Sequence, residues 1–552
     1  MNVSGYEAQT VLFAARPSRL ALQQLELEGD RSRVVTVNVW RNHAIESVVT
    51  ATIPYMARVG CIADFRLSDY DDTLMFTGHR QADLELVWVD SGRYLTSTPF
   101  ADWARWLAGR VAALRGVSSA PVIIATWLAD AAQEAELMAR LGTVPGVFLA
   151  DLQAACNEAT TTLIDSRTAA LAGTPLGNAA QLVVARKLAC HWIPAAIWPP
   201  IKVVAVDLDN TLHSGVLGED GLGGVSLTPA HQALQRFLKA QRERGVFLAL
   251  VSRNEASDVQ ALFTVREDYP LRWEDFSATE VSWGDKAESL SRIAKALRVA
   301  PDSMLFVDDN PGELASVVSR LPQVHTVYAG SDPAETQRAI EYYPGLWRWK
   351  IERDDAKRIE DLKANAEREQ LLAETVNPSE YFHNLHVSIA LRVNPSDLLG
   401  RLSDLCGKTN QFNLALRRLN QAELAARLGH ADDCVVSMQL TDRLSDSGVI
   451  GVVVGHREGE RLIIEELCVS CRAMGRHLED ALILPAICRM PCSAGCREVV
   501  FQVAHGSRNQ PALDWLARIA DLNGRPAPGV CAVDADRLRQ FPHPQGITYV
   551  QD

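Results

Sequence analysis

Two carboxylates follow an apolar run in the middle of this 552-residue chain. The run Val203–Val206 leads directly into Asp207, and Asp209 follows two residues later. Because side chains alternate along a strand, the turn after this run must bring Asp209 beside Asp207. Asp is also common in solvated turns, so this pair alone does not establish a catalytic site.

Three further polar motifs follow in order and support a chemical role for the pair. They are Ser252-Arg253-Asn254 after a second apolar run, Lys286 at the start of a helical pattern, and Asp308-Asp309 after a third run. In an open parallel sheet, ligands bind at the carboxyl ends of the strands. The motifs therefore predict a hydroxyl, an ammonium group and four carboxylates at one sheet edge, where Mg²⁺ with oxygen ligands assists attack on a phosphate monoester.

The elements that would position these motifs alternate between strands and helices. Strand-like runs cover residues 203–206, 246–251, 304–307 and 324–328, and helical patterns cover about 229–244, 256–264, 285–298 and 311–320. This alternation predicts a doubly wound parallel sheet.

Residues 200–330 resemble the haloacid dehalogenase superfamily, because the four motifs occur in that family's order. The resemblance implies that Asp207 is the nucleophile and forms an aspartyl-phosphate. It implies that Asp207, the backbone carbonyl of Asp209, and Asp308 hold Mg²⁺, with Asp309 in support. Asp209 would act as the general acid and base.

The same resemblance gives the remaining polar residues a place near the phosphate. Ser252 and Lys286 would hold the phosphoryl oxygens. Thr211, Arg253 and Asn254 lie beside these motifs and are further candidates for substrate binding.

The segment after the nucleophile, residues 212–221, resembles FkbH-like proteins. These are glyceryl transferase/phosphatases of polyketide biosynthesis, which take a glyceryl unit from 1,3-bisphosphoglycerate to the phosphopantetheine thiol of an acyl carrier protein. His213 and Ser214 stand where that family usually has Trp and Gly. His213 is interpreted either as a substrate contact or as a solvent-facing loop histidine.

The spacers from Asp207 to Ser252 and from Ser252 to Lys286 are too short for a large cap domain. We therefore expect an open site, which suits a substrate presented by a macromolecule or by another domain of the chain.

Two segments near the C-terminus, 408–414 and 470–476, resemble the acetyltransferase-like domain of the FkbH-like proteins. The resemblance makes Asn410, Gln411, Arg472 and Gly475 candidates for binding the acyl or pantetheine group, although turn and cap chemistry explains them as well. Cys471, beside Arg472, is the candidate acyl-carrying thiol, and a small core residue is its alternative interpretation.

The chain as a whole is predicted to be an α/β protein of three domains. Residues 1–195 suggest an open α/β scaffold of flavodoxin or SGNH type, with strand-like runs that include 11–13, 34–39 and 84–89. Residues 200–350 form the phosphatase domain, 351–376 a charged, solvated linking helix, and 377–552 an α+β acetyltransferase-like domain.

Composition limits the range of functions. The net charge of −13 without a dense basic block argues against nucleic acid as a partner. The sequence shows no leader or membrane span, so we expect a cytoplasmic protein without membrane contact. The eleven cysteines are expected to be reduced, and Cys488, Cys492 and Cys496 lack a fourth ligand for zinc.

Two rival functions remain open at this stage. One is a phosphatase of a free small metabolite with the outer domains as scaffold. The other is a catalytically silent module that binds a carrier protein, which the complete set of acidic motifs disfavours.

Overall fold

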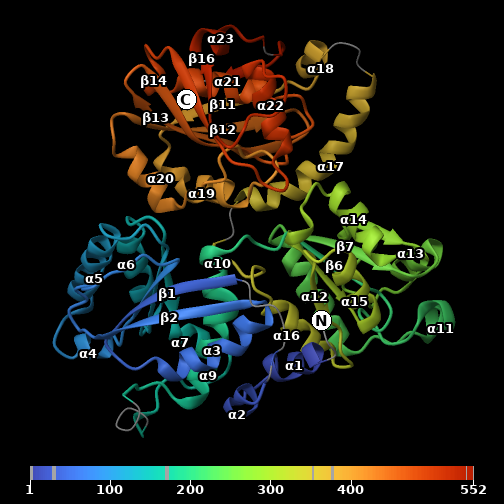
Figure 1. Cartoon of the computed structure of the whole chain (residues 1–552). Coiled ribbons are helices and arrows are strands. Elements are labelled where there is room, and N and C mark those ends of the chain that lie inside the picture. Colours follow the sequence, from blue (N-terminus) through green and yellow to red (C-terminus); the bar gives the residue numbers. More distant parts are fainter. Residues whose placement is uncertain are drawn as a thin grey trace. The chain divides into compact units, whose positions relative to one another are not determined.

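The computed structural model describes residues 4–25, 27, 33–167, 173–350, 353–374, 378–542 and 544–550. The chain divides into two compact units, Met1–Ile351 and Glu352–Asp552. The described residues form two five-stranded sheets and one seven-stranded sheet (Figure 1). The prediction of an α/β protein with parallel sheets and an α+β C-terminal part is confirmed, and the C-terminal sheet is mixed.

The first sheet is parallel, with the strand order β2-β1-β3-β4-β5. Its strands are β1 (Arg33–Arg41), β2 (Cys61–Tyr70), β3 (Leu84–Trp88), β4 (Val122–Thr126) and β5 (Val147–Asp151). The accompanying helices are α1 (Ser4–Leu12), α2 (Arg19–Gln23), α3 (Glu46–Arg58), α4 (Gly92–Leu95), α5 (Phe100–Arg115), α6 (Ala131–Leu141), α7 (Leu152–Glu158), α9 (Asn178–Lys187) and α10 (Ile193–Ile197).

Two sequence interpretations fail in this first sheet. The run 11–13 was expected to be a strand, but it lies at the end of helix α1, where Leu12 and Phe13 pack into the core. Strand β2 was not predicted, because it is an edge strand whose residues are largely exposed or half-buried. An edge strand lacks the continuous apolar pattern that marks buried parallel strands.

The second sheet is also parallel and has the order β10-β9-β6-β7-β8. Its strands are β6 (Val203–Val206), β7 (Phe247–Ser252), β8 (Ala278–Val281), β9 (Met304–Asp308) and β10 (His325–Tyr328). Its helices are α11 (Leu217–Gly224), α12 (Pro229–Glu243), α13 (Ala256–Val265), α14 (Lys286–Ala296), α15 (Pro311–Arg320) and α16 (Pro333–Glu341). Strands β6, β7 and β9 are fully buried, which explains their apolar runs.

The seven-stranded sheet of the second unit is mixed, with the order β16-β15-β14-β13-β12-β11-β17. Its strands are β11 (Ser388–Val393), β12 (Asp433–Thr441), β13 (Asp446–Glu458), β14 (Arg461–Val469), β15 (Glu498–Val503), β16 (Gly529–Asp534) and β17 (Thr548–Val550). Its helices are α17 (Arg353–Glu374), α18 (Pro378–Asn384), α19 (Leu399–Lys408), α20 (Gln421–Leu428), α21 (Glu479–Arg489), α22 (Gln510–Ala520) and α23 (Ala535–Gln540).

Helix α17 is not the solvated linker that its charged sequence suggested. Asp361 and Arg368 are only 1% and 2% exposed. Asp361 accepts two hydrogen bonds from Arg476 at 2.9 Å, and Arg368 forms a two-pronged pair with Asp442 at 2.8 and 2.9 Å. The buried charges of this helix therefore join it to the seven-stranded sheet.

Among the helices of the described residues, none has the length and the apolar character needed to cross a membrane.

Candidate functional site

The predicted phosphate motifs meet at the carboxyl ends of three neighbouring strands. Asp207 directly follows β6, and its N–H donates to the Val307 carbonyl at 2.9 Å, which extends the β6–β9 pairing. Ser252 is the last residue of β7, and Asp308 is the last residue of β9. Because β6 lies between β7 and β9, the three side chains converge at one edge of the sheet.

Three carboxylates form a candidate metal centre at this edge. One oxygen atom from each of Asp207, Asp308 and Asp309 lies within 4.8 Å of the others. The Lys286 ammonium lies 2.8 Å from Oδ1 of Asp207 and 2.6 Å from Oδ2 of Asp308. The described residues contain no other such cluster of metal-ligating side chains, and the cysteines at 488, 492 and 496 do not form one.

The electrostatics of this cluster fit a divalent cation. Burial raises the pKa of Asp207, the Lys286 ammonium offsets part of that rise, and Asp308 adds to it. Burial and then Asp308 also raise the pKa of Asp309. Three ionised carboxylates and one ammonium group would leave an excess negative charge in a buried site, which a hard cation with oxygen ligands would neutralise.

The turn after Asp207 brings Asp209 back to the same edge. Asn210 adopts a left-handed backbone conformation with φ of 51°, and its Oδ1 accepts a hydrogen bond from the Gly215 N–H at 3.0 Å. Gly215 has φ of 100°, and a Cβ atom there would lie 2.7 Å from Oδ2 of Asp220. The turn thus requires glycine at position 215.

Three donors hold the carboxylate of Asp209. Oδ1 accepts from the Leu217 N–H at 2.9 Å and lies 3.2 Å from Nε2 of His213, and Oδ2 accepts from Nδ2 of Asn254 at 2.8 Å. Burial would raise the pKa of Asp209, but the hydrogen bonds from His213, Leu217 and Asn254 outweigh burial and lower it. The ionised form is therefore favoured in the resting protein.

His213 occupies neither of the two environments expected from the sequence. It is 0% exposed, so it is not a solvent-facing loop residue, and its ring is covered by the protein rather than open to a substrate. Its ring packs against Tyr269 with centroids 6.1 Å apart. The contact between His213 and Asp209 makes His213 a positioning residue.

The other candidates near the carboxylate cluster differ in their placement. Oγ of Ser252 lies 3.0 Å from Nδ2 of Asn254, which joins both residues to Asp209. Oγ1 of Thr211 is buried and has no hydrogen-bond partner among the described residues. Arg253 instead pairs with Glu313 at 2.8 Å, so in this structure its guanidinium is engaged at α15.

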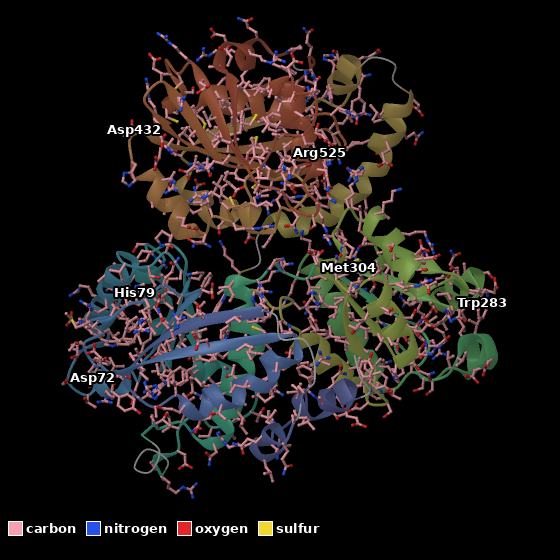
Figure 2. All side chains as sticks on the ribbon, in the orientation of Figure 1. Asp72, His79, Trp283, Met304, Asp432 and Arg525 are labelled. Atoms are coloured by element: carbon pink, nitrogen blue, oxygen red, sulfur yellow. The ribbon has the colours of Figure 1, made fainter. Side chains whose placement is uncertain are left out.

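Trp283 and Glu255 form a contact that the sequence analysis missed. The Trp283 side chain is 67% exposed, and its Nε1–H donates to Oε1 of Glu255 at 2.7 Å. Glu255 follows Asn254, and Trp283 lies three residues before Lys286, so the bond joins two loops that carry site residues. Figure 2 shows Trp283 at the surface. The sequence signal for this contact was an acidic residue and a tryptophan, each close to one of the site motifs.

The chain between Asp207 and Ser252 contains helices α11 and α12, and the chain between Ser252 and Lys286 contains α13, a short 3₁₀ turn and β8. These elements belong to the parallel sheet and its flanking helices. A separate cap domain is therefore absent from these two segments, all of whose residues the structure describes.

In the second unit, the candidate acyl-transfer residues lie on two loops. Oδ1 of Asn410 accepts a hydrogen bond from Arg418, and Gln411 is half-buried. Cys471 is partly exposed, and the Arg472 N–H donates to Oγ of Ser470 at 3.4 Å.

Gly475 has φ of 73° and open space where a Cβ would lie. The next residue, Arg476, is engaged by Asp361. The turn that carries Cys471 is thus followed at once by a buried ion pair with helix α17.

Comparison with known proteins finds only limited similarity. No protein-family description matches the chain, and no curated protein matches it. The chain is similar to the N-terminal part of a Bacteroides fragilis protein that contains a phosphatase domain complexed with Mg, with 18% identity and a TM-score of 0.45, over 62% of this chain and 99% of the other.

A second similar structure is a GCN5-related glucosamine N-acetyltransferase region in a fungal multi-domain β-N-acetylglucosaminidase. It has 10% identity and a TM-score of 0.19, over 94% of this chain and 67% of the other. Both TM-scores lie below 0.5.

Proposed function

We propose that this chain is a Mg²⁺-dependent phosphohydrolase of the haloacid dehalogenase type, with Asp207 as its nucleophile. The observation that carries the proposal is the meeting of Asp207, Asp308 and Asp309 at one sheet edge, with the Lys286 ammonium between two of them. Asp207 and Asp308 with the Asp209 carbonyl would hold the ion, supported by Asp309. When bound, Mg²⁺ would neutralise phosphoryl and carboxylate oxygens so that an anion can approach phosphorus.

The residues of the site account for both halves of the reaction. An oxygen of Asp207 forms a bond to phosphorus and the bond from phosphorus to the leaving oxygen breaks. Asp209, which first takes up a proton from solvent, gives that proton to the leaving oxygen. Water then attacks the aspartyl-phosphate while Asp209 takes a proton from it, which releases phosphate and restores Asp207. Lys286 and Ser252 would hold the phosphoryl oxygens, and Asn254 and His213 keep Asp209 in place.

We further propose that the natural substrate is a phosphorylated glyceryl group on the phosphopantetheine arm of an acyl carrier protein. The support is the resemblance of residues 212–221, 408–414 and 470–476 to FkbH-like proteins, together with the lack of a cap domain between the phosphate motifs. The second unit would transfer the 3-phosphoglyceryl group from 1,3-bisphosphoglycerate, with release of inorganic phosphate, first to the candidate enzyme thiol of Cys471 and then to the carrier thiol.

The decisive experiment measures the intact mass of a phosphopantetheinylated carrier protein. The carrier is incubated with the full chain, Mg²⁺ and 1,3-bisphosphoglycerate generated in place. We expect a glyceryl mass gain with the wild type and a phosphoglyceryl adduct with Asp207→Asn. Asp332→Asn is the matched control, because Asp332 caps helix α16 and is not a member of the carboxylate cluster, and asparagine caps equally well.

The outcomes separate the two levels of the proposal. If no tested carrier gains mass but the wild type hydrolyses small phosphomonoesters and Asp207→Asn does not, the chain is a phosphatase of a free metabolite. If neither activity depends on Asp207, the phosphohydrolase itself is refuted.

A further inference from the structure

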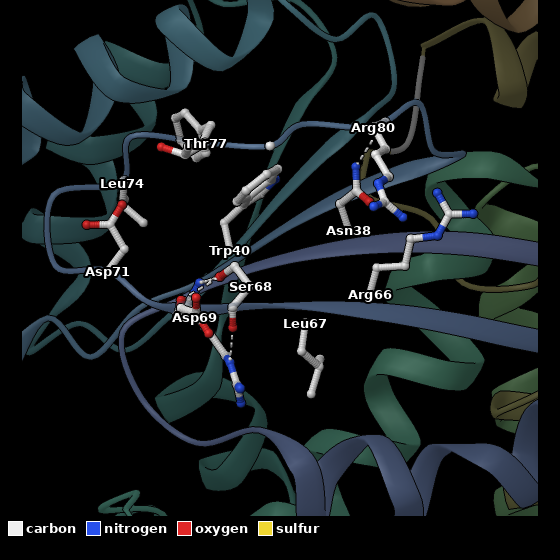
Figure 3. A pocket seen from close by; sticks show the side chains of 13 residues that line it. Asn38, Trp40, Arg66, Leu67, Ser68, Asp69, Asp71, Leu74, Thr77 and Arg80 are labelled. Carbon is white, nitrogen blue, oxygen red and sulfur yellow. Dashed lines mark hydrogen bonds between the residues drawn. The ribbon is translucent and has the colours of Figure 1, made fainter.

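A hollow of about 590 Å³ lies on the first sheet, over strands β1 and β2 (Figure 3). Its lining residues belong to β1, β2 and the loop 71–80, so it is separate from the phosphate motifs on the second sheet. Cavities that hold small organic ligands usually have volumes of about 300–1,000 Å³. The hollow is therefore large enough for a ligand of nucleotide size.

The floor of the hollow is rigid. Asn38 of β1 pairs with Arg66 of β2, so these residues share one face of the sheet with Trp40 and Ser68 two residues further along. Nε1 of Trp40 donates to the buried carboxylate of Glu85 at 2.7 Å, which fixes the indole ring. Trp40 is 8% exposed, so a ligand would meet a preformed polar surface that includes a small part of the indole.

The wall of the hollow is also preformed. Asp71 accepts hydrogen bonds from the N–H groups of Thr73 at 2.7 Å and Met75 at 2.8 Å, which closes the start of the loop. Leu74 and Phe76 adopt left-handed conformations, with φ of 49° and 57°, and both side chains are buried. These bonds and buried side chains keep the loop in place over the sheet.

Two arginines lie at one end of the hollow, beside Asn38 (Figure 3). Nη1 of Arg66 donates to the Gln81 carbonyl at 3.0 Å, so the Arg66 guanidinium lies beside the backbone that carries Arg80. Arg66 also pairs with Asp64, whereas the exposed Arg80 side chain has no hydrogen-bond partner in the described part of the chain. Asp64 offsets the charge of Arg66 only, so the two arginines retain a net positive charge at this end of the hollow, which an anion would neutralise.

Asn38 adds a hydrogen-bond acceptor at this end of the hollow. It is 5% exposed, and both of its side-chain hydrogen bonds to described residues use the amide nitrogen, one to the Arg80 carbonyl and one to Glu85. Its amide oxygen therefore remains for a donor on a ligand. Asp69 and Asp71 lie at the opposite end, and Asp71 is engaged within its own loop (Figure 3).

We propose that this hollow is a binding site for a small organic anion, with the phosphate or carboxylate of the ligand between Arg66 and Arg80. A hydrogen-bond donor on the ligand faces the Asn38 amide oxygen, and the body of the ligand lies against Trp40. The site gives the first sheet a binding role that is independent of the phosphohydrolase proposed above.

The test is residue-resolved protection from phenylglyoxal, an arginine reagent, read by peptide mass spectrometry on the full chain. The probes are AMP, 4′-phosphopantetheine and citrate, with adenosine and pantetheine as uncharged counterparts. We expect at least one anion to slow modification of both Arg66 and Arg80, while neither uncharged probe does so. Arg105, an exposed arginine of helix α5, is the reference that no probe protects.

Arginine variants give the second measurement. Because a charged hydrogen bond to an arginine contributes about 1.5–3 kcal/mol, Arg80→Gln should weaken binding of the protecting anion by about tenfold or more. Arg105→Gln should leave binding unchanged, and all variants should keep wild-type phosphatase activity. Arg80 is exposed, so this variant keeps the fold even if Arg66→Gln does not. Unchanged modification of Arg80 with every anion, or equal affinity of Arg80→Gln and wild type, would overturn the proposal.

Discussion

His213 and Asp209 form a partly buried contact, with Nε2 of the histidine 3.2 Å from Oδ1 of the aspartate. The histidine lies on the turn that returns the chain to the sheet edge, and it is fully buried. The two side chains therefore form a fixed pair in which His213 determines the orientation of the proposed general acid and base.

Replacing His213 by Leu should lower kcat about tenfold with little change in KM, because one hydrogen bond to the Asp209 carboxylate contributes roughly 1.5 kcal/mol. His213→Gln keeps a donor at this position and should retain more activity than His213→Leu. Steady-state kinetics with a small phosphomonoester give the measurement. Equal kcat values for both variants would show that the contact does not position Asp209.

Mg²⁺ should stabilise the first unit as well as support activity. At a free concentration 100 times its Kd, the ion would add about 2.7 kcal/mol to the free energy of unfolding. Thermal unfolding with EDTA and with Mg²⁺ measures the shift. Asp308→Asn should remove it, whereas Asp332→Asn should keep it, and a shift that survives in Asp308→Asn would place the ion elsewhere.

Trp283→Phe should reduce kcat/KM by about two- to fivefold, because it removes an exposed hydrogen bond that contributes roughly 0.5–1 kcal/mol. The aromatic ring remains, so the variant isolates the N–H group that joins the loop before Lys286 to Glu255. Glu255→Gln, which still offers an acceptor, should have a smaller effect. If Trp283→Phe has wild-type kinetics, the loops are held by other contacts.

Asp361→Ala should destabilise the second unit by about 3–5 kcal/mol, because it leaves the two buried guanidinium groups of Arg368 and Arg476 to share the single carboxylate of Asp442. Lys357, on the same helix, forms a more exposed ion pair with Asp446 of β13. Lys357→Ala removes this pair and should lower the free energy of unfolding by about 1 kcal/mol or less. Urea denaturation followed by circular dichroism compares the two variants. Equal losses of unfolding free energy in the two variants would mean that the buried ion pairs contribute no more stability than the exposed pair.

Acid should weaken the first unit through His43. Burial, reinforced by Arg93 and Arg41, lowers the pKa of His43 to about 3, whereas the unfolded chain titrates near 6.5. Between these values only the unfolded state binds the proton, so stability is complete above about pH 6.5 and falls as the pH decreases. At pH 5 the loss from this residue is about 2 kcal/mol.

His43→Asn lacks this titration. Urea denaturation at pH 7.5 and pH 5 should therefore show a smaller pH-dependent loss for the variant than for the wild type, since all other groups are shared. The same loss in both proteins would exclude His43 as the source.

The strands that carry the phosphate motifs were predictable because each has a local signal. Strands β6, β7 and β9 are buried on both faces, so they appear as continuous apolar runs that end in Asp207, Ser252 and Asp308. Edge strands β2 and β8 were missed, because half-exposed residues do not produce such runs.

The remaining errors concern partners that are distant in the sequence. The burial of His213 depends on Tyr269, and the loop contact of Trp283 depends on Glu255. The many charged residues of helix α17 predict a solvated helix, but Arg368 contacts Asp442, a residue 74 positions later in the chain, once the protein has folded. Residue spacing along one segment contains no information on such partners.

The ion pairs between helix α17 and the seven-stranded sheet also determine where the chain tolerates division. A fragment that begins at residue 378 would lack Asp361 and Arg368, and would leave Arg476 and Asp442 without their partners. A fragment that begins ahead of Arg353 would retain all four residues. Gene fusion, recombination between related proteins, or proteolytic release of the second unit would therefore preserve a stable product only with a junction on the N-terminal side of this helix.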